Sequence, residues 1–124
     1  TMLLRIFKTA DSDELRLVAG SGLALMGELP VVALIKEMET ADAQRRAWIA
    51  GVLGAIGEPA SDPLLDARGR AEDLELKKWL AAALVVVGDA RALDMIRQLP
   101  EEEQPDPPKI EAAREVFVRL QKLL

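Results

Sequence analysis

The chain repeats itself at an interval of 31 residues (46 to 77), and this repeat restricts the fold more than any other feature of the sequence. Segment 46–58 (RAWIAGVLGAIGE) aligns without a gap with segment 77–89 (KKWLAAALVVVGD), so that Trp48 coincides with Trp79. An earlier copy, segment 16–28 (RLVAGSGLALMGE), aligns with the second at an interval of 30. A second, shorter apolar segment follows each copy. Self-similarity with such a period is typical of proteins built from stacked repeats.

The first half of each repeat has the apolar spacing of a helix that is buried on most sides. In segment 46–58 the large apolar residues follow one broad helical face, and small residues fill the gaps between them. The large residues are Trp48, Ile49, Val52, Leu53 and Ile56, and the small ones are Ala50, Gly51, Gly54 and Ala55. Because small residues let neighbouring helices approach closely, we expect other helices to cover this one.

The ends of these first helices carry recognisable signals. Asp42 and Asp73 are expected N-caps, and a basic residue four positions after each is expected to pair with it. Gly27, Gly57 and Gly88 are expected to end the helices, because glycine adopts the left-handed conformation without strain. A short second helix then follows in each repeat, ending near Met38, Arg68 and Leu99.

We therefore predict a single all-α domain over residues 1–124, built from stacked helical hairpins with about three full repeats. One hairpin cannot bury its own apolar surface, whereas each hairpin in a stack covers the next. The expected segments are 1–10 (half repeat or cap helix), 11–40, 41–71 and 72–100 (repeats), and 107–124 (C-terminal cap helix).

The two ends of the chain depart from the repeat. Segment 3–11 resembles segment 34–42, which indicates either a fragment of a longer protein or a lone helix that caps the stack. If the chain has an architectural role, the apolar residues at this end are expected to be exposed and to pair with another repeat; they are Leu3, Leu4, Ile6 and Phe7. Segment 100–108 is rich in Pro and Glu, which favours a rigid, solvated loop in which Glu101–Glu103 is a linker. The last helix has a single apolar stripe, as an end cap requires.

Composition excludes several classes of function. The formal net charge is −5, whereas a nucleic-acid or anionic-membrane surface normally requires basic residues. The absence of Cys and His removes disulfides, the usual zinc sites, thiol nucleophiles and imidazole bases. Because these groups are missing, we expect no cofactor and no enzymatic activity. We also expect a cytoplasmic location, since a chain without Cys is compatible with a reducing compartment.

Three local patterns have a structural interpretation that we favour over a functional one. Trp48 and Trp79 have the chemistry to stack a ligand, but at equivalent positions of an apolar helix they are expected in the core. Segment 20–22 (GSG) lies within a helical pattern and precedes no strand, so it is not a phosphate-binding loop. The acidic residues of the second helices lack a converging base, metal ligand or oxyanion donor, which argues against a catalytic carboxylate pair.

The helix–Gly–acid–short-helix unit, with Asp and a basic residue at each repeat start, resembles the HEAT-like repeats of the bilin-lyase type. The resemblance covers about residues 11–99 and is carried by segments 46–50, 57–60 and 63–65. It implies a right-handed α-α superhelix whose second helices line a concave, partner-binding face. The metal-binding hydroxylases of this class use His–Glu pairs, which this chain lacks, so that activity is not implied.

The resemblance makes a protein-protein interaction scaffold or adaptor the leading hypothesis for function. The residues expected to bind the partner lie on the second helices and are Lys36, Asp62, Asp66, Arg68, Asp94 and Arg97. The partner is expected to be another protein or another domain of the same chain. A tetrapyrrole-binding enzyme subunit of the bilin-lyase kind is the alternative. A third hypothesis is an architectural role as a spacer or oligomer interface.

Overall fold

The computed structural model describes residues 2–124, and this part of the chain is all-helical, with no strand, as predicted. The α-helices are α1 (Met2–Thr9), α2 (Asp13–Leu25), α3 (Val31–Thr40), α4 (Ala43–Ile56), α5 (Ser61–Arg70), α6 (Leu74–Val87), α7 (Ala90–Arg97) and α8 (Pro107–Leu123). Two single 3-10 turns, Glu58–Ala60 and Glu101–Glu103, precede α5 and α8. Hence each repeat predicted from the sequence contains a longer first helix (α2, α4, α6) and a shorter second helix (α3, α5, α7).

The helix ends form as the sequence predicts. The carboxylates of Asp42 and Asp73 cap α4 and α6 by accepting a first-turn amide hydrogen bond, at 2.9 and 3.1 Å. Gly57 and Gly88 are the C-caps of the same helices, with φ of +87° and +79°. A side chain at either glycine would strain the backbone, since L-residues rarely adopt these angles.

The basic residue after each N-cap has a different partner from the one expected. Arg46 donates from Nε to the carbonyl of Met38 at 2.9 Å and from Nη2 to that of Glu39 at 3.2 Å. Arg16 likewise donates from Nη2 to the carbonyl of Ala10 at 2.9 Å. These carbonyls lie at or just after the ends of α3 and α1, where backbone acceptors lack helical donors. The predicted ion pair with Asp42 or Asp73 is therefore wrong. Arg16 and Arg46 instead connect α2 and α4 to the helix before each of them, whereas Lys77 of α6 pairs with Glu103.

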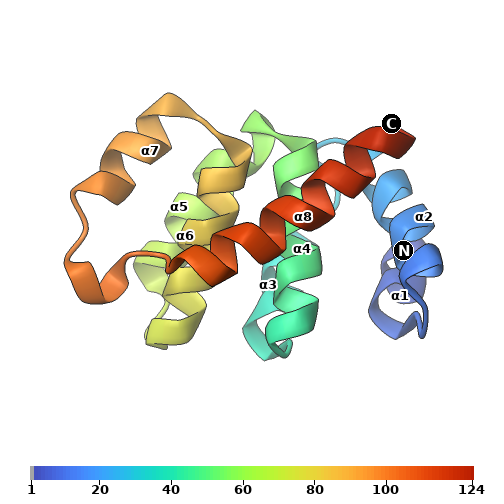
Figure 1. Ribbon diagram of the computed structural model, residues 1–124, viewed down its shortest axis with the longest axis horizontal. Coiled ribbons are helices and arrows are strands. Elements are labelled where there is room, and N and C mark those ends of the chain that lie inside the picture. Colours follow the sequence, from blue (N-terminus) through green and yellow to red (C-terminus); the bar gives the residue numbers. More distant parts are fainter. Residues whose placement is uncertain (1) are drawn as a thin grey trace.

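The first helices lie side by side in a row, α2 beside α4 and α4 beside α6 (Figure 1). The short helices α1, α3 and α5 pack on the first helix that follows each of them in the chain (α2, α4 and α6), whereas α7 packs on α6, which precedes it. Helix α3 also contacts α5. The apolar side chains between these helices form one core, whose largest fully buried members include Leu23, Leu34, Met38, Ile49, Leu53, Leu64, Leu80 and Leu84.

Helix α8 crosses the row of first helices and packs most extensively on α4, then on α6 and α2 (Figure 1). This position differs from the expected cap at the end of the stack. The reason is the small-residue surface of α4, where a Cβ added to Gly51 would overlap Val116 of α8. The same added atom would lie 3.0 Å from the carbonyl oxygen of Ala113, so the two backbones meet at close range. Ala113, Val116 and Leu120 are the buried residues of α8.

The apolar residues of α1 are less exposed than predicted. Phe7 is buried, and the other three expected residues, Leu3, Leu4 and Ile6, pack partly buried against the core. The exposed large apolar side chains of these two helices are Met2 of α1 and Leu15, Val18 and Leu25 of α2. The expectation that Phe7 is exposed is therefore wrong, because α1 folds back against α2 and buries it.

Candidate functional site

Each tryptophan lies beneath a cation supplied by α8. Trp48 and Trp79 are both 5% exposed, which confirms that they belong to the core. The Nζ atom of Lys109 lies 5.6 Å from the ring centroid of Trp79, and the Cζ atom of Arg119 lies 5.6 Å from that of Trp48. Attraction between a cation and the electron-rich face of an indole stabilises both contacts. The equivalent tryptophans of two repeats are thus contacted by one helix that belongs to neither.

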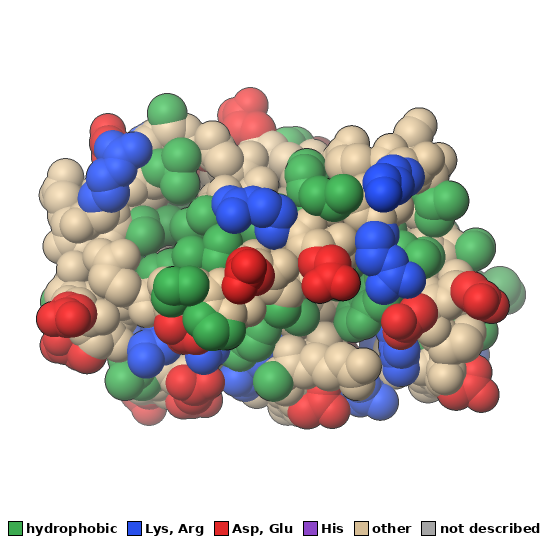
Figure 2. Space-filling view, in the orientation of Figure 1, with side chains coloured by type: hydrophobic (Ala, Val, Ile, Leu, Met, Phe, Trp, Pro, Cys, Tyr) green, Lys and Arg blue, Asp and Glu red, His purple; other side chains and the backbone are tan. Residues whose placement is uncertain are grey.

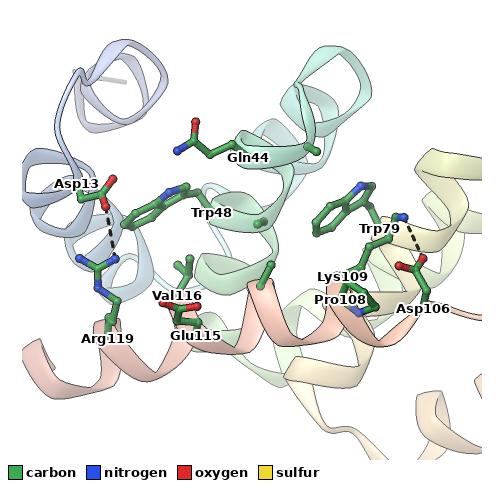
Figure 3. Close-up of a pocket in the computed structure, with 13 residues that line it drawn as sticks. Asp13, Gln44, Trp48, Trp79, Asp106, Pro108, Lys109, Glu115, Val116 and Arg119 are labelled. Atoms are coloured by element: carbon green, nitrogen blue, oxygen red, sulfur yellow. Dashed lines mark hydrogen bonds and ion pairs between the residues drawn. The ribbon is translucent and has the colours of Figure 1, made fainter.

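A groove of about 470 Å³ runs between α8 and the N-terminal part of α4. We call it the two-tryptophan groove, because Trp48 and Arg119 lie at one end and Trp79 and Lys109 at the other (Figure 3). Its other lining residues are Asp13, Ala43, Gln44, Ala47, Asp106, Pro108, Ala112, Glu115 and Val116. Apolar and aromatic walls with a few polar groups on the rim are typical of sites that bind a ligand.

The cation at the Trp79 end is held by two carboxylates. Nζ of Lys109 lies 2.9 Å from Asp106 and 3.2 Å from Glu75. Burial lowers the pKa of Lys109, but its hydrogen bonds to these carboxylates outweigh that effect and leave the pKa above its ordinary value of 10.5. The hydrogen bond from Lys109 in turn lowers the pKa of Asp106. Lys109 and Asp106 therefore both stay charged at neutral pH.

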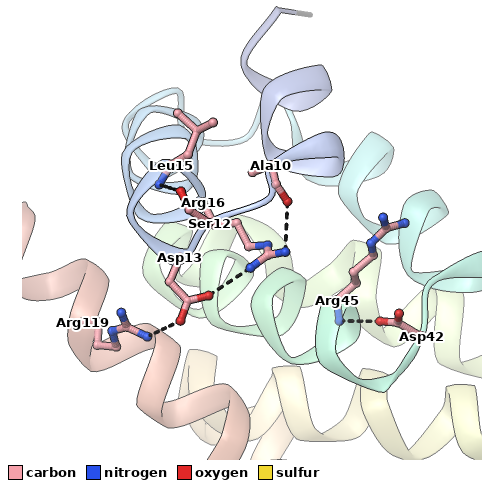
Figure 4. A network of polar contacts seen from close by, with 8 residues as sticks. All are labelled: Ala10, Ser12, Asp13, Leu15, Arg16, Asp42, Arg45 and Arg119. Atoms are coloured by element: carbon pink, nitrogen blue, oxygen red, sulfur yellow. Dashed lines mark hydrogen bonds and ion pairs between the residues drawn. The ribbon is translucent and has the colours of Figure 1, made fainter.

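The cation at the Trp48 end belongs to a network that joins three helices. Asp13 of α2 accepts from Nη1 of Arg16 at 2.9 Å and forms an ion pair with Arg119 of α8 at 3.6 Å (Figure 4). Arg16 also lies over the ring of Trp48, 6.0 Å from its centroid. The network fixes the C-terminal half of α8 against α2 and α4.

Two polar side chains of the groove remain without a partner. Glu115 and Gln44 are exposed, and neither side chain forms a hydrogen bond or ion pair with any residue of 2–124. The rim has three carboxylates (Asp13, Asp106, Glu115) against two cations (Lys109, Arg119), and both cations are already paired. The groove can therefore bind an apolar group that is accompanied by a positive charge.

The structure brings together two of the six residues predicted to bind a partner. Lys36 of α3 and Asp66 of α5 line a second groove, of about 320 Å³, which Val32 and Arg70 also line. Val32 is 71% exposed, so this groove has an apolar wall in contact with solvent. Here Asp66 forms an ion pair with Arg70 at 3.0 Å.

The other four predicted residues are distributed along α5 and α7. Asp62 forms an ion pair with Arg91, which links α5 to α7, and Asp94 forms an ion pair with Arg97 at 2.7 Å within α7. Arg68 also lies on α5, but it does not take part in these surface ion pairs. Its side chain is partly buried and pairs with Glu103 of the loop that precedes α8.

That loop is not the freely solvated linker that the sequence predicts. The carboxylate of Glu103 lies 3.3 Å from both Arg68 and Lys77, and its side chain is only 22% exposed. The hydrogen bond from Lys77 is the main cause that lowers the pKa of Glu103, and Arg68 contributes to the same shift. The prediction fails because the turn Glu101–Glu103 returns to the core and places one of its three carboxylates between two cations.

Comparisons with protein-family models, with curated proteins and with solved structures find no match for this chain. Within residues 2–124, no helix combines the length and the apolar character that crossing a bilayer requires. The same residues contain no group of three or more acidic side chains placed to hold a metal ion. The two grooves and their side chains are therefore the features that bear on function.

The two-tryptophan groove is a site that the sequence does not reveal. Its tryptophans are correctly predicted to be buried, but the groove exists only because α8 lies across them. The one sequence signal is the spacing of Lys109 and Arg119, ten residues apart on an amphipathic helix. That spacing has meaning only once the position of α8 is known.

Proposed function

We propose that this chain is a protein-interaction module of HEAT-like repeats, a scaffold or adaptor whose second helices bind a partner protein. In this proposal the hairpins form a right-handed superhelix, and α3, α5 and α7 provide the partner-binding side. The observation that carries the proposal is the position of α8. It covers the row of α2, α4 and α6, whereas none of the described elements covers the opposite, outward side of α3 and α5.

The composition of the uncovered side supports a protein partner. Exposed Val32 supplies apolar area, and Lys36 beside it forms no ion pair with any described residue. Around them lie charges of both signs, most of them in pairs on the surface. Exposed pairs of this kind contribute little to stability, about 0–1 kcal/mol each, so they are free to exchange partners when another protein binds. Interfaces between proteins characteristically combine apolar contacts with a polar rim.

The alternative of a tetrapyrrole-binding enzyme subunit has less support. A bilin carries propionate groups, which require cations, whereas the two-tryptophan groove has an excess of carboxylates on its rim. Lys109 and Arg119 are the cations of that groove, and each is already engaged by a carboxylate. An acidic rim favours cationic groups, and therefore favours a polypeptide over an anionic pigment.

Affinity capture with the intact protein tests the proposal. A variant that combines Lys36→Glu, Asp66→Arg, Asp94→Arg and Arg97→Glu should lose the partner that the parent chain captures. A matched control, Glu111→Arg with Arg114→Glu, reverses two exposed charges on α8 and should keep it. Far-ultraviolet circular dichroism should show equal helicity for all three proteins. Retention of the partner by the first variant would show that the second helices are not the binding side.

A further inference from the structure

The two-tryptophan groove has the length of a short peptide segment. Lys109 and Arg119 mark its ends and are ten residues apart on α8, which corresponds to about 15 Å at 1.5 Å per residue. An extended polypeptide covers this distance with about four to five residues, at roughly 3.3 Å each. The groove follows one side of α8, so an extended segment can lie parallel to that helix.

The middle of the groove is apolar and is lined by small side chains. Ala47 of α4 lines the groove together with Ala112 and Val116 of α8. Small residues on both walls leave space that a large side chain such as leucine or methionine fills. A peptide with one large apolar side chain in this segment would therefore bury it between the tryptophans.

The polar groups of the rim define the charge of the ligand. Lys109 and Arg119 are neutralised by Asp106 and Asp13, while Glu115 remains an unpaired carboxylate. A positive side chain next to the apolar anchor would complete an ion pair with Glu115. The face that carries α8 also exposes apolar side chains between charges of both signs (Figure 2). The net charge of −5 favours approach of a basic segment over an acidic one.

We propose that the two-tryptophan groove binds a short, extended, basic segment of a partner protein, in which a large apolar side chain adjoins Lys or Arg. The apolar side chain occupies the space between Ala47 and Val116, and the basic side chain pairs with Glu115. The free amide of Gln44 on the opposite wall is available to hydrogen bond with the backbone of the segment. This site is separate from the side formed by α3, α5 and α7, and it does not require that side to bind anything.

Intrinsic fluorescence offers a direct test, because Trp48 and Trp79 are the two tryptophans of the chain. The probe is an acetylated and amidated peptide, Ala-Leu-Arg-Ala-Leu-Arg, titrated to about 1 mM. We expect a saturable change in emission. Replacement of Leu by Ala in the probe should weaken binding about tenfold, because apolar burial supplies most of the affinity. Replacement of Arg by Glu in the probe should also weaken it.

Variants of the protein test the role assigned to the rim. Glu115→Gln should weaken binding of the Leu-Arg peptide about two- to fivefold, the range expected for one exposed ion pair. Glu111→Gln removes the same charge one helical turn away, outside the groove, and should leave the affinity unchanged. Both residues are exposed, so both variants should fold like the parent chain.

Three results would overturn this proposal. The first is no saturable emission change with the Leu-Arg peptide, and the second is equal affinity for the Leu-Arg and Leu-Glu peptides. The third is loss of peptide binding in the Lys36→Glu, Asp66→Arg double variant together with unchanged binding in Glu115→Gln. That result would place the peptide on the second helices. Conversely, if the Lys36→Glu, Asp66→Arg double variant still binds the peptide, the proposal for the two-tryptophan groove stands, even if no partner of α3, α5 and α7 is ever captured.

Discussion

The ammonium group of Lys109 lies over the indole ring of Trp79, with Nζ 5.6 Å from the ring centroid. The same atom is within ion-pair distance of Glu75, so this side chain links α8 to α6 by two contacts, and it also pairs with Asp106, the N-cap of its own helix. Its side chain is only 13% exposed, which limits the screening of these contacts by water.

Lys109→Met should lower the free energy of unfolding by about 1–2 kcal/mol, because it keeps the apolar stem but removes the charge. Urea denaturation followed by circular dichroism measures the change. Lys122→Met, at the exposed end of the same helix, should change stability by less than about 0.5 kcal/mol. Because the pKa of Lys109 is raised, its contribution is complete below pH 10.5 and disappears only as the pH rises through the higher folded-state value. Equal urea midpoints for Lys109→Met and the parent chain would show that the contacts of the Lys109 ammonium group do not stabilise the fold.

Glu103→Gln should lower the urea midpoint at pH 7, because Arg68 and Lys77 would lose their shared carboxylate. The folded-state pKa of Glu103 is below its ordinary value of 4.5, so the carboxylate stabilises the fold above that value. As the pH falls from 4.5 through the folded-state pKa, this contribution is lost and the two proteins should converge. Glu102→Gln, at the exposed neighbouring residue, should show no such pH-dependent difference. A Glu103→Gln deficit that is the same at pH 3 and pH 7 would exclude a role for its charge.

Gly51→Ala should destabilise the protein by about 1–2 kcal/mol, although alanine is the better helix former. The added Cβ would overlap Val116, and the cost of overpacking exceeds the gain in helix propensity of about 1 kcal/mol. Gly69→Ala is the matched control, because an added Cβ there meets no atom within 4 Å, and it should stabilise the chain by about 0.5–1 kcal/mol. Urea denaturation shows whether each substitution raises or lowers the free energy of unfolding. A stabilising Gly51→Ala would show that α8 does not pack on this surface.

Ser61→Ala should raise the free energy of unfolding by about 1 kcal/mol. The Ser61 side chain is 1% exposed, and its hydroxyl oxygen has no hydrogen-bond partner. In the repeat alignment this position corresponds to Val31, which is equally buried and apolar. Thermal and urea unfolding measure the change, with Ser12→Ala as a control that should destabilise by about 1 kcal/mol through loss of an N-cap. A destabilising Ser61→Ala would indicate that the hydroxyl has a partner after all.

The sequence predicts the helices and their ends well, because those depend on neighbouring residues. The interval of 31 residues places Trp48 and Trp79 in equivalent, buried surroundings, as the structure confirms. Asp42 caps its helix because its carboxylate accepts from the free amide of Arg45, and Gly57 ends the same helix because glycine tolerates the positive φ. Such signals need no knowledge of the tertiary arrangement.

Long-range placement is where the sequence is insufficient. The apolar stripe of α8 shows that one side of this helix is covered, but not that α4 is the surface that covers it. The partner of Glu103 is 35 residues away at Arg68, and only the return of the loop reveals it. The two-tryptophan groove depends on the same placement, since Lys109 and Arg119 contact tryptophans from two different repeats.

Both functional proposals depend on α8 lying across the first helices, because this position leaves α3 and α5 uncovered and creates the two-tryptophan groove. Nuclear Overhauser contacts between the α-protons of Gly51 and the methyl groups of Val116 measure it most directly. The close approach of these residues predicts strong cross-peaks. Their absence, together with contacts from Val116 to α7, would place α8 at the end of the stack and would contradict both proposals.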